Sequence, residues 1–268
     1  MTRLVLLLLL ALSSTAHAII IRHDVEDSEY RVPASDFPAL ADMPSEGHGV
    51  LIAPQWIVTA AHTMPGHPEE ITLNGVRRRV ERLIVHPGYE ELPQSLIAQA
   101  IKSSDASRAM QFQASNDDIA LLKLATPVTD VAPAIIYRHD DESGRTVKLI
   151  GKGATGNGST GESPNGSERS VLRRAYNTIT RADGHWLVYR FDSGPSSHAL
   201  EGMSGSGDSG GPVLIKANGQ WQLAGLAAWK YVQGNAAAFR VGFYGQETYN
   251  VRLSSYVKWI DSVVSSGD

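Results

Sequence analysis

Short apolar runs separated by turn-forming residues dominate the pattern along this chain of 268 residues. Gly, Pro, Asn and Asp cluster between the runs, as they do between the strands of a sheet. The runs predict strands at residues 49–52, 56–59, 79–85, 118–124, 146–150, 186–191, 212–215 and 222–228. Because these short strands do not alternate regularly with helices, we predict an all-β barrel or sandwich.

Helical spacing is confined to two places. Val257, Ile260 and Val264 recur at helical intervals and predict a short amphipathic helix near the C-terminus. A second short helix is predicted near residues 96–102, inside a segment that otherwise has the composition of a loop. Residues 151–170 are rich in Gly, Ser and Asn and predict a mobile surface loop.

The start of the chain has the three parts of a secretory signal peptide. Arg3 is a positive start, residues 4–12 are apolar, and Ala16-His17-Ala18 fits a cleavage site. The apolar run is too short to cross a membrane comfortably, and no second run of membrane length follows. We therefore predict that residues 1–18 are removed and that the mature protein is secreted or periplasmic, with no membrane partner.

Composition excludes several classes of partner and of catalytic site. The net charge of −4 does not indicate a nucleic-acid partner, and the absence of cysteine excludes disulfides, thiolate metal sites and a cysteine nucleophile. The nine histidines include no H-E-x-x-H pair, which disfavours a zinc hydrolase. No metal and no cofactor is predicted.

The segment Gly-Asp-Ser-Gly-Gly-Pro, from Gly207 to Pro212, is the most specific motif. Acyl transfer needs a nucleophile on a tight turn, with backbone N–H groups aimed at the developing oxyanion. The glycines around Ser209 allow that geometry and keep side chains away from a substrate. Ser209 is therefore the predicted nucleophile, and a Gly-rich turn that merely contains serine is the alternative.

A histidine and an acid complete the candidate chemistry. His62 ends the apolar segment Thr-Ala-Ala-His and could accept the proton of a serine at neutral pH. Asp118 directly precedes an Ile-Ala-Leu run and could orient the histidine, while Asp117 is a competing candidate. The other histidines beyond the signal segment lack such a context and are expected at the surface or in loops.

These three pieces together resemble the chymotrypsin-like (trypsin-like) serine proteases. The order His, Asp, Ser matches that family, and residues 84–89, 226–229 and 256–260 resemble further family segments. The resemblance implies two antiparallel six-stranded β-barrels, residues 19–135 and 136–268, with a short C-terminal helix and an active site between them. It also implies a catalytic triad of His62, Asp118 and Ser209.

The same resemblance implies two further roles in the serine loop. The N–H groups of Gly207 and Ser209 would form the oxyanion hole. Asp208 would pair with a new N-terminal ammonium, which cleavage after Ala18 would place on Ile19. The alternative is that residues 19–21 are only an edge strand.

Four positions are expected at the substrate. Alignment back from Ser209 places Met203 at the base of the specificity pocket, which gives no charge for a basic side chain and favours an apolar or small one. Trp229 would form a pocket wall. Ala228 stands where the family usually has a serine that supports the triad aspartate, and Lys230 stands where it usually has glycine.

The expected function is that of a secreted, monomeric serine endopeptidase that hydrolyses peptide or protein substrates through an acyl-enzyme. The long interval between His62 and Asp118 implies an insertion around residues 90–115 beside the cleft. Ala228 and Lys230 keep open a second interpretation, a weakly active or inactive secreted binding protein on a protease fold.

Overall fold

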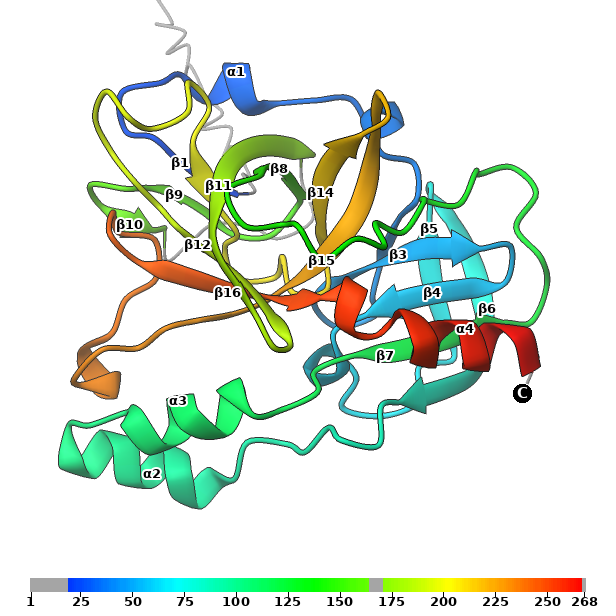
Figure 1. Ribbon diagram of the computed structural model, residues 1–268, viewed down its shortest axis with the longest axis horizontal. Helices are drawn as coiled ribbons and strands as arrows, with labels where there is room; N and C mark the ends of the chain where they lie inside the picture. Colours follow the sequence, from blue (N-terminus) through cyan, green and yellow to red (C-terminus); the bar gives the residue numbers. More distant parts are fainter. Residues whose placement is uncertain (1–18, 164–170, 267–268) are drawn as a thin grey trace, which may run out of the picture.

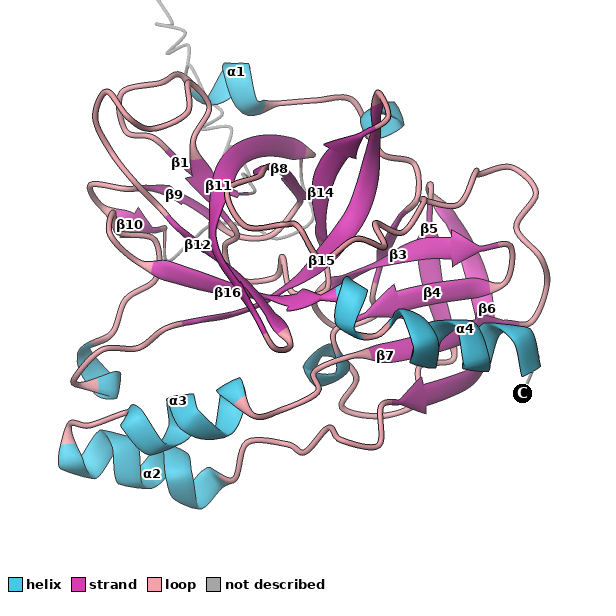
Figure 2. Ribbon diagram, in the orientation of Figure 1, coloured by secondary structure: helices cyan, strands magenta, loops and turns pink. Residues whose placement is uncertain are grey.

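Two closed β-barrels make up most of the computed structural model, which describes residues 19–163 and 171–266 (Figures 1 and 2). The predicted signal segment, residues 1–18, lies outside the described residues, as do residues 164–170 of the predicted loop. Neighbouring strands within each barrel are antiparallel, and each barrel has six strands. The predicted two-barrel all-β architecture is therefore confirmed.

The first barrel has the strand order β2-β3-β4-β7-β6-β5. Its strands are Leu40–Asp42 (β2), His48–Ala53 (β3), Trp56–Thr59 (β4), Glu70–Leu73 (β5), Val76–Val85 (β6) and Ala120–Leu124 (β7). All four residues of β4 are buried, which is why its continuous apolar run identified it in the sequence. β7 begins two residues after Asp118, so the predicted acid lies just before the strand.

The second barrel has the order β11-β12-β16-β15-β14-β8. Its strands are Thr146–Gly151 (β8), Arg173–Asp183 (β11), Trp186–Arg190 (β12), Pro212–Ala217 (β14), Gln220–Lys230 (β15) and Glu247–Arg252 (β16). A short sheet, β10-β9-β1-β13, lies beside it and consists of Gly161–Glu162, Thr155–Asn157, Ile19–Ile21 and Gly202–Met203. The expectation that residues 151–170 form only a loop was wrong, because β9 and β10 form there.

The helices are short. They are α1 (Asp27–Tyr30), α2 (Gln94–Ser103), α3 (Ser107–Ala114) and α4 (Val257–Ser266), with 3-10 turns η1 (Ala34–Asp36), η2 (Ala61–Thr63), η3 (Ala236–Ala238) and η4 (Leu253–Ser255). The C-terminal helix is thus confirmed, and its Ile260 packs into the core. None of the helices in the described ranges is long and apolar enough to span a membrane.

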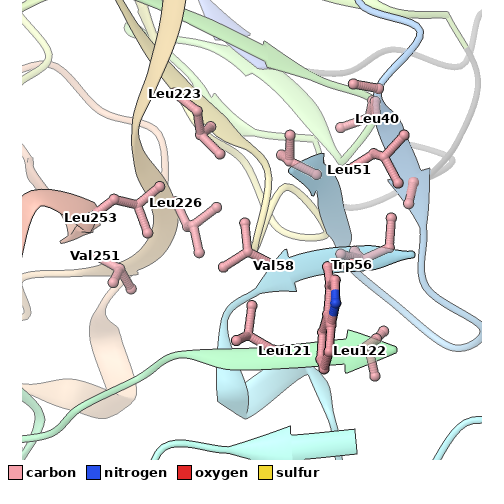
Figure 3. Packing of buried hydrophobic residues seen from close by; sticks show 14 of the residues in the cluster. Leu40, Leu51, Trp56, Val58, Leu121, Leu122, Leu223, Leu226, Val251 and Leu253 are labelled. Carbon is pink, nitrogen blue, oxygen red and sulfur yellow. The ribbon is translucent and has the colours of Figure 1, made fainter. Parts of the chain in front are cut away.

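One hydrophobic core continues through both barrels. Leu51, Val58 and Leu121 of the first barrel belong to the same cluster as Leu226 and Val251 of the second, as Figure 3 shows. Docking of the barrels therefore buries apolar area in a single core, and this fixes their relative position. A second cluster joins the three isoleucines of β1, Ile20 among them, to buried residues of the second barrel.

The insertion between β6 and β7 is a helical hairpin, formed by α2 and α3, where the sequence predicted one short helix. Asn116 closes its neck, because its side chain accepts from Glu90 N–H at 2.8 Å and donates to the Glu90 carbonyl at 2.6 Å. The far part of the hairpin lies next to η3 of the second barrel, as Figure 1 shows. The Trp186 indole donates to the Ala114 carbonyl at 2.8 Å and attaches the end of α3 to β12.

A buried ion pair ties the N-terminal segment to the second barrel. The Arg173 side chain is completely buried on β11, and its Nε and Nη2 donate to the two oxygens of Asp27 at 2.6 and 2.9 Å. A buried guanidinium is strongly destabilising when its partner is removed. The pair therefore fixes α1, and with it the approach of the chain from β1, against the barrel.

Replacement of this partner should destabilise the protein. We expect Asp27→Ala to lower the free energy of unfolding by about 3–5 kcal/mol, measured by denaturant titration. Asp24→Ala is the matched control, because Asp24 pairs with Arg22 at the surface and exposed pairs contribute little. Equal midpoints for the two variants would contradict this role of the buried pair.

Candidate active site

His62 and Asp118 meet at the edge of the first barrel. η2 directly follows β4 and places His62 beside the loop that precedes β7. His62 Nδ1 lies 2.6 Å from Asp118 Oδ2, and the His62 backbone N–H donates to Asp118 Oδ1 at 2.9 Å. Asp118 is buried, whereas the His62 side chain is 36% exposed. The imidazole is thus held by one nitrogen and accessible to a reactant.

The neighbouring acid, Asp117, has different partners. Its Oδ1 accepts from the Tyr256 hydroxyl at 2.7 Å and lies 2.6 Å from His185 Nδ1. His86 Nδ1 lies 3.3 Å from its other oxygen. The two adjacent aspartates therefore point to different surroundings, and the structure places Asp118, not Asp117, at His62.

Asp118 also sets the protonation of the imidazole. Removal from water works to lower the pKa of His62, but the negative charge and the hydrogen bond of Asp118 outweigh it and raise that pKa above its ordinary value. An ionised partner at hydrogen-bond distance favours the imidazolium form. This environment favours a histidine that accepts a proton readily.

The loop that carries Ser209 is attached to both barrels by its backbone. His48 N–H of β3 donates to the Ser209 carbonyl at 2.7 Å, and Gly210 N–H donates to the Ala227 carbonyl of β15 at 2.7 Å. Gly210 has φ +74°, and a Cβ there would collide with the His48 carbonyl and the Thr59 hydroxyl. The glycine after Ser209 is therefore required both by its φ and by the closeness of β3.

Two N–H groups of this loop have no acceptor. Within the described ranges, neither the Gly207 nor the Ser209 N–H donates a hydrogen bond to the protein. Gly207 has φ +81°, a conformation that glycine adopts without strain. Ser209 and His62 both line a cavity of about 310 Å³, together with Glu46. The loop thus brings Ser209 to the cavity that His62 lines, and the N–H groups of Gly207 and Ser209 donate to no acceptor among the described residues.

Asp208 points away from the cleft into the protein. Its carboxylate accepts from Gly153 N–H at 2.7 Å and from Gly205 N–H at 2.8 Å, and it lies 3.9 Å from His48 Nε2. Burial raises the pKa of Asp208 in spite of these partners. Ile19, the predicted partner, is buried in β1 and pairs with Thr155, two residues after Gly153.

These positions agree with the comparison with known proteins. Residues 28–260 match the family model described as Trypsin. The chain belongs to the trypsin family. Vitamin K-dependent protein C from Mus musculus is 26% identical over 239 residues, which cover 81% of this chain and 45% of that protein. The chain therefore spans less than half the length of this relative, and the family assignment supports a serine protease at the general level.

The positions predicted at the substrate have varied surroundings in this trypsin-family chain. Met203 is fully buried in β13, where it pairs with Ile20. Trp229 stacks on Tyr249 with ring centroids 3.9 Å apart. Lys230 is partly exposed, and its Nζ donates to the Gly205 carbonyl at 3.3 Å. Ala228, Trp229 and Lys230 lie on β15, and the methyl group of Ala228 cannot donate a hydrogen bond to Asp118.

Sequence reasoning missed two contributors to the site. His48 was expected at the surface or in a loop, but its side chain is 1% exposed, between Asp42 and Asp208. Its position at the start of an apolar strand is the only sequence signal for this burial. The sequence predicted an insertion beside the cleft but did not show that it forms part of the cavity. In the structure, Ile97 and Gln113 of this helical hairpin line a cavity of about 290 Å³ together with His62.

The described part of the chain contains no cluster of His, Asp and Glu that could hold a metal ion. The polar groups of the candidate site are His62, which the buried Asp118 holds, and Ser209, which lines the same cavity as His62.

The Gly210 contact predicts a specific sensitivity. Gly210→Ala should lower stability and activity, because it combines strained backbone with overlap against β3. Gly219→Ala is the matched control, because its φ is similar, +78°, but a Cβ there would meet no atom within 4 Å. We expect the Gly210 variant to lose at least about 1 kcal/mol more than the control in denaturant unfolding. Equal losses would show that the contact with β3 is unimportant.

Proposed function

We propose that this trypsin-family chain is an exported serine endopeptidase with His62, Asp118 and Ser209 as its catalytic triad. The observation that carries the proposal is the 2.6 Å contact between His62 and the buried Asp118, with Ser209 in the same cavity as His62. The substrate is a peptide or protein. The signal-like segment at residues 1–18 and the family assignment support export.

The reaction follows from the positions of these groups. Ser209 Oγ attacks the scissile carbonyl carbon as His62 accepts the hydroxyl proton, and the Gly207 and Ser209 N–H groups bind the oxyanion. His62 then donates the proton to the leaving amine, and an acyl-enzyme remains. A water molecule attacks the ester, gives its proton to His62, and the proton returns to Ser209 as the acid product leaves. Asp118 stabilises the imidazolium in both steps.

The same proposal includes activation by a new N-terminus. Among the described residues, the buried Asp208 carboxylate accepts from two backbone N–H groups, and the one ion-pair contact of its side chain is with His48 at 3.9 Å, so a free ammonium on Ile19 would supply it with a close cation. Cleavage after Ala18 would create this terminus without a separate activation step. The loop that carries Ser209 would then become structurally ordered only after export has removed residues 1–18.

A serine-reactive fluorophosphonate tests the central claim. We expect one adduct on the exported wild-type protein by intact mass, none on Ser209→Ala, and a starting mass that begins at Ile19. A variant with one extra residue before Ile19 should fold but label at least about tenfold more slowly, because one lost ion pair disorders the oxyanion donors. No adduct on a folded, correctly processed protein would favour the inactive binding protein instead.

The raised pKa of His62 predicts the pH dependence. The base is the neutral imidazole, so kcat/KM should be complete above the pKa of His62 and lost as the pH falls through it, with an acid limb above about 6.5. Asp118→Asn should move that limb to lower pH and reduce kcat by roughly 10⁴-fold. Asp117→Asn is the matched control, and an acid limb shifted equally by both variants would argue against the assignment of Asp118.

A further inference from the structure

Glu46 is an exposed acidic residue next to the candidate nucleophile. It lies in the tight turn between β2 and β3, which the Met43 N–H closes by donating to the Gly47 carbonyl at 3.1 Å. Glu46 lines the cavity of about 310 Å³ that His62 and Ser209 also line. The turn therefore brings a negative charge to the place where the proposed reaction occurs.

Close packing fixes this turn beside the loop that carries Ser209. A Cβ on Gly47 would lie 2.9 Å from the Ser209 carbonyl oxygen and 2.8 Å from the Thr63 methyl group, so the two backbones are in direct contact. The next residue, His48, donates its N–H to the same Ser209 carbonyl at 2.7 Å. The position of Glu46 is thus set by the backbone of the turn and not only by its own flexible side chain.

The Glu46 side chain has no hydrogen-bond or ion-pair partner among the described residues. Burial works to lower the pKa values of His62 and Lys230, and the negative field of Glu46 works to raise both. Lys230 lies beyond ion-pair distance of Glu46, and its Nζ donates to the Gly205 carbonyl at 3.3 Å. The charge of Glu46 therefore acts across the cleft without a direct contact that neutralises it.

The other walls of this cavity suit the stem of a long side chain. Pro65 and Thr63 line it on one side, and Ser45 lines it beside Glu46. The Thr63 hydroxyl donates to the Ala60 carbonyl at 2.7 Å and is occupied within the protein. Lysine and arginine lay an apolar stem along such walls and keep the charged head in a polar, solvated place. A proline wall next to a free carboxylate matches both parts of a basic side chain.

The position of the turn decides which half of a substrate meets Glu46. The Gly210 N–H bonds to Ala227 of β15, so β15 flanks the serine loop from the second barrel, whereas the turn reaches that loop from the first. Residues 228–230, expected beside the acyl half of the substrate, lie on β15. The leaving amine takes its proton from His62, which lines the cavity with Glu46. The leaving half of the peptide therefore runs toward the turn.

We propose that Glu46 selects a basic side chain, lysine or arginine, at the first or second residue on the carboxyl side of the cleaved bond. This rests on the proposed endopeptidase function and names a feature of its substrates. An acidic side chain at the same position is disfavoured, because two carboxylates would then share one cavity. The selection concerns the leaving half of the peptide and is separate from the expectation drawn from Met203, which concerns the acyl half.

A peptide panel tests the assignment on the mature exported protein. A peptide that is cleaved at one bond is varied to Lys, Met, Gln or Glu at the first or second residue after that bond, and kcat/KM is compared. We expect Lys to exceed Gln and Met by roughly threefold to fivefold at one position, as an exposed ion pair supports, and Glu to fall below Gln. The preference should shrink as salt rises. Equal rates for Lys and Gln at both positions would overturn the proposal.

Variants separate the carboxylate from the fold. Glu46→Gln should bring the ratio of Lys to Gln turnover close to one, and Glu46→Lys should make the Glu peptide better than the Lys peptide. Glu69→Gln is the matched control and should keep the ratio, because Glu69 is an exposed acid just before β5 that does not line the cavity. An unaltered ratio in Glu46→Gln, or an equal loss in Glu69→Gln, would contradict the role of Glu46.

Fluorophosphonate labelling of Ser209 distinguishes this failure from failure of the proposed function, because the reagent has no peptide on its leaving side. A Glu46→Gln protein that labels is folded, so its changed ratio reports on the carboxylate. Wild-type protein that labels and cleaves peptides without a preference for Lys rejects the specificity alone. Protein that does not label, or that labels and cleaves no peptide of a mixed-sequence library, rejects both proposals.

Discussion

The backbone hydrogen bonds that attach the Ser209 loop to both barrels are the constraint on which the cleft depends. His48 N–H reaches the loop from the first barrel, and Gly210 N–H bonds to Ala227 of the second. His62 and Asp118 belong to the first barrel, so the candidate reactive groups can meet only where the barrels dock. The continuous core of Leu51, Val58, Leu226 and their neighbours keeps the two barrels in contact. Burial of apolar area therefore fixes the relative positions of the residues in the cleft.

Much of the fold could be predicted because many strands are nearly pure apolar runs. β4 and β7 are buried along most of their length, and their sequences show it. β11 and β16 were not predicted, because their buried faces carry Arg173, Asn177 and Asn250. A hydrophobic pattern cannot identify a strand whose inward positions are polar, since the partners that satisfy those groups come from distant parts of the chain.

In the candidate site, too, some residues could be predicted from the sequence and others could not. Ser209 was a candidate because the glycines around it meet a local requirement of the backbone, and His62 because it ends an apolar strand; the structure places both at one cavity. The choice of Asp118 over Asp117 depended on adjacency to a strand, and the structure separates them by their partners, His62 for one and Tyr256 for the other. The burial of His48 depends on tertiary packing between Asp42 and Asp208, and its place at the start of an apolar strand was a weak sequence signal for it.

The neck formed by Asn116 and Glu90 has a consequence for how this protein can change. Two hydrogen bonds close the insertion where it leaves the first barrel, so β6 and β7 are joined as if by a short turn. The entropy of closing a loop grows slowly with its length, and residues beyond a closed neck add little cost to the barrel. Evolution or a protein engineer can therefore rebuild the part of residues 91–113 that walls the cavity beside His62 with little change to the barrel, provided that the contacts of Met110 and Ala114 with the second barrel are kept.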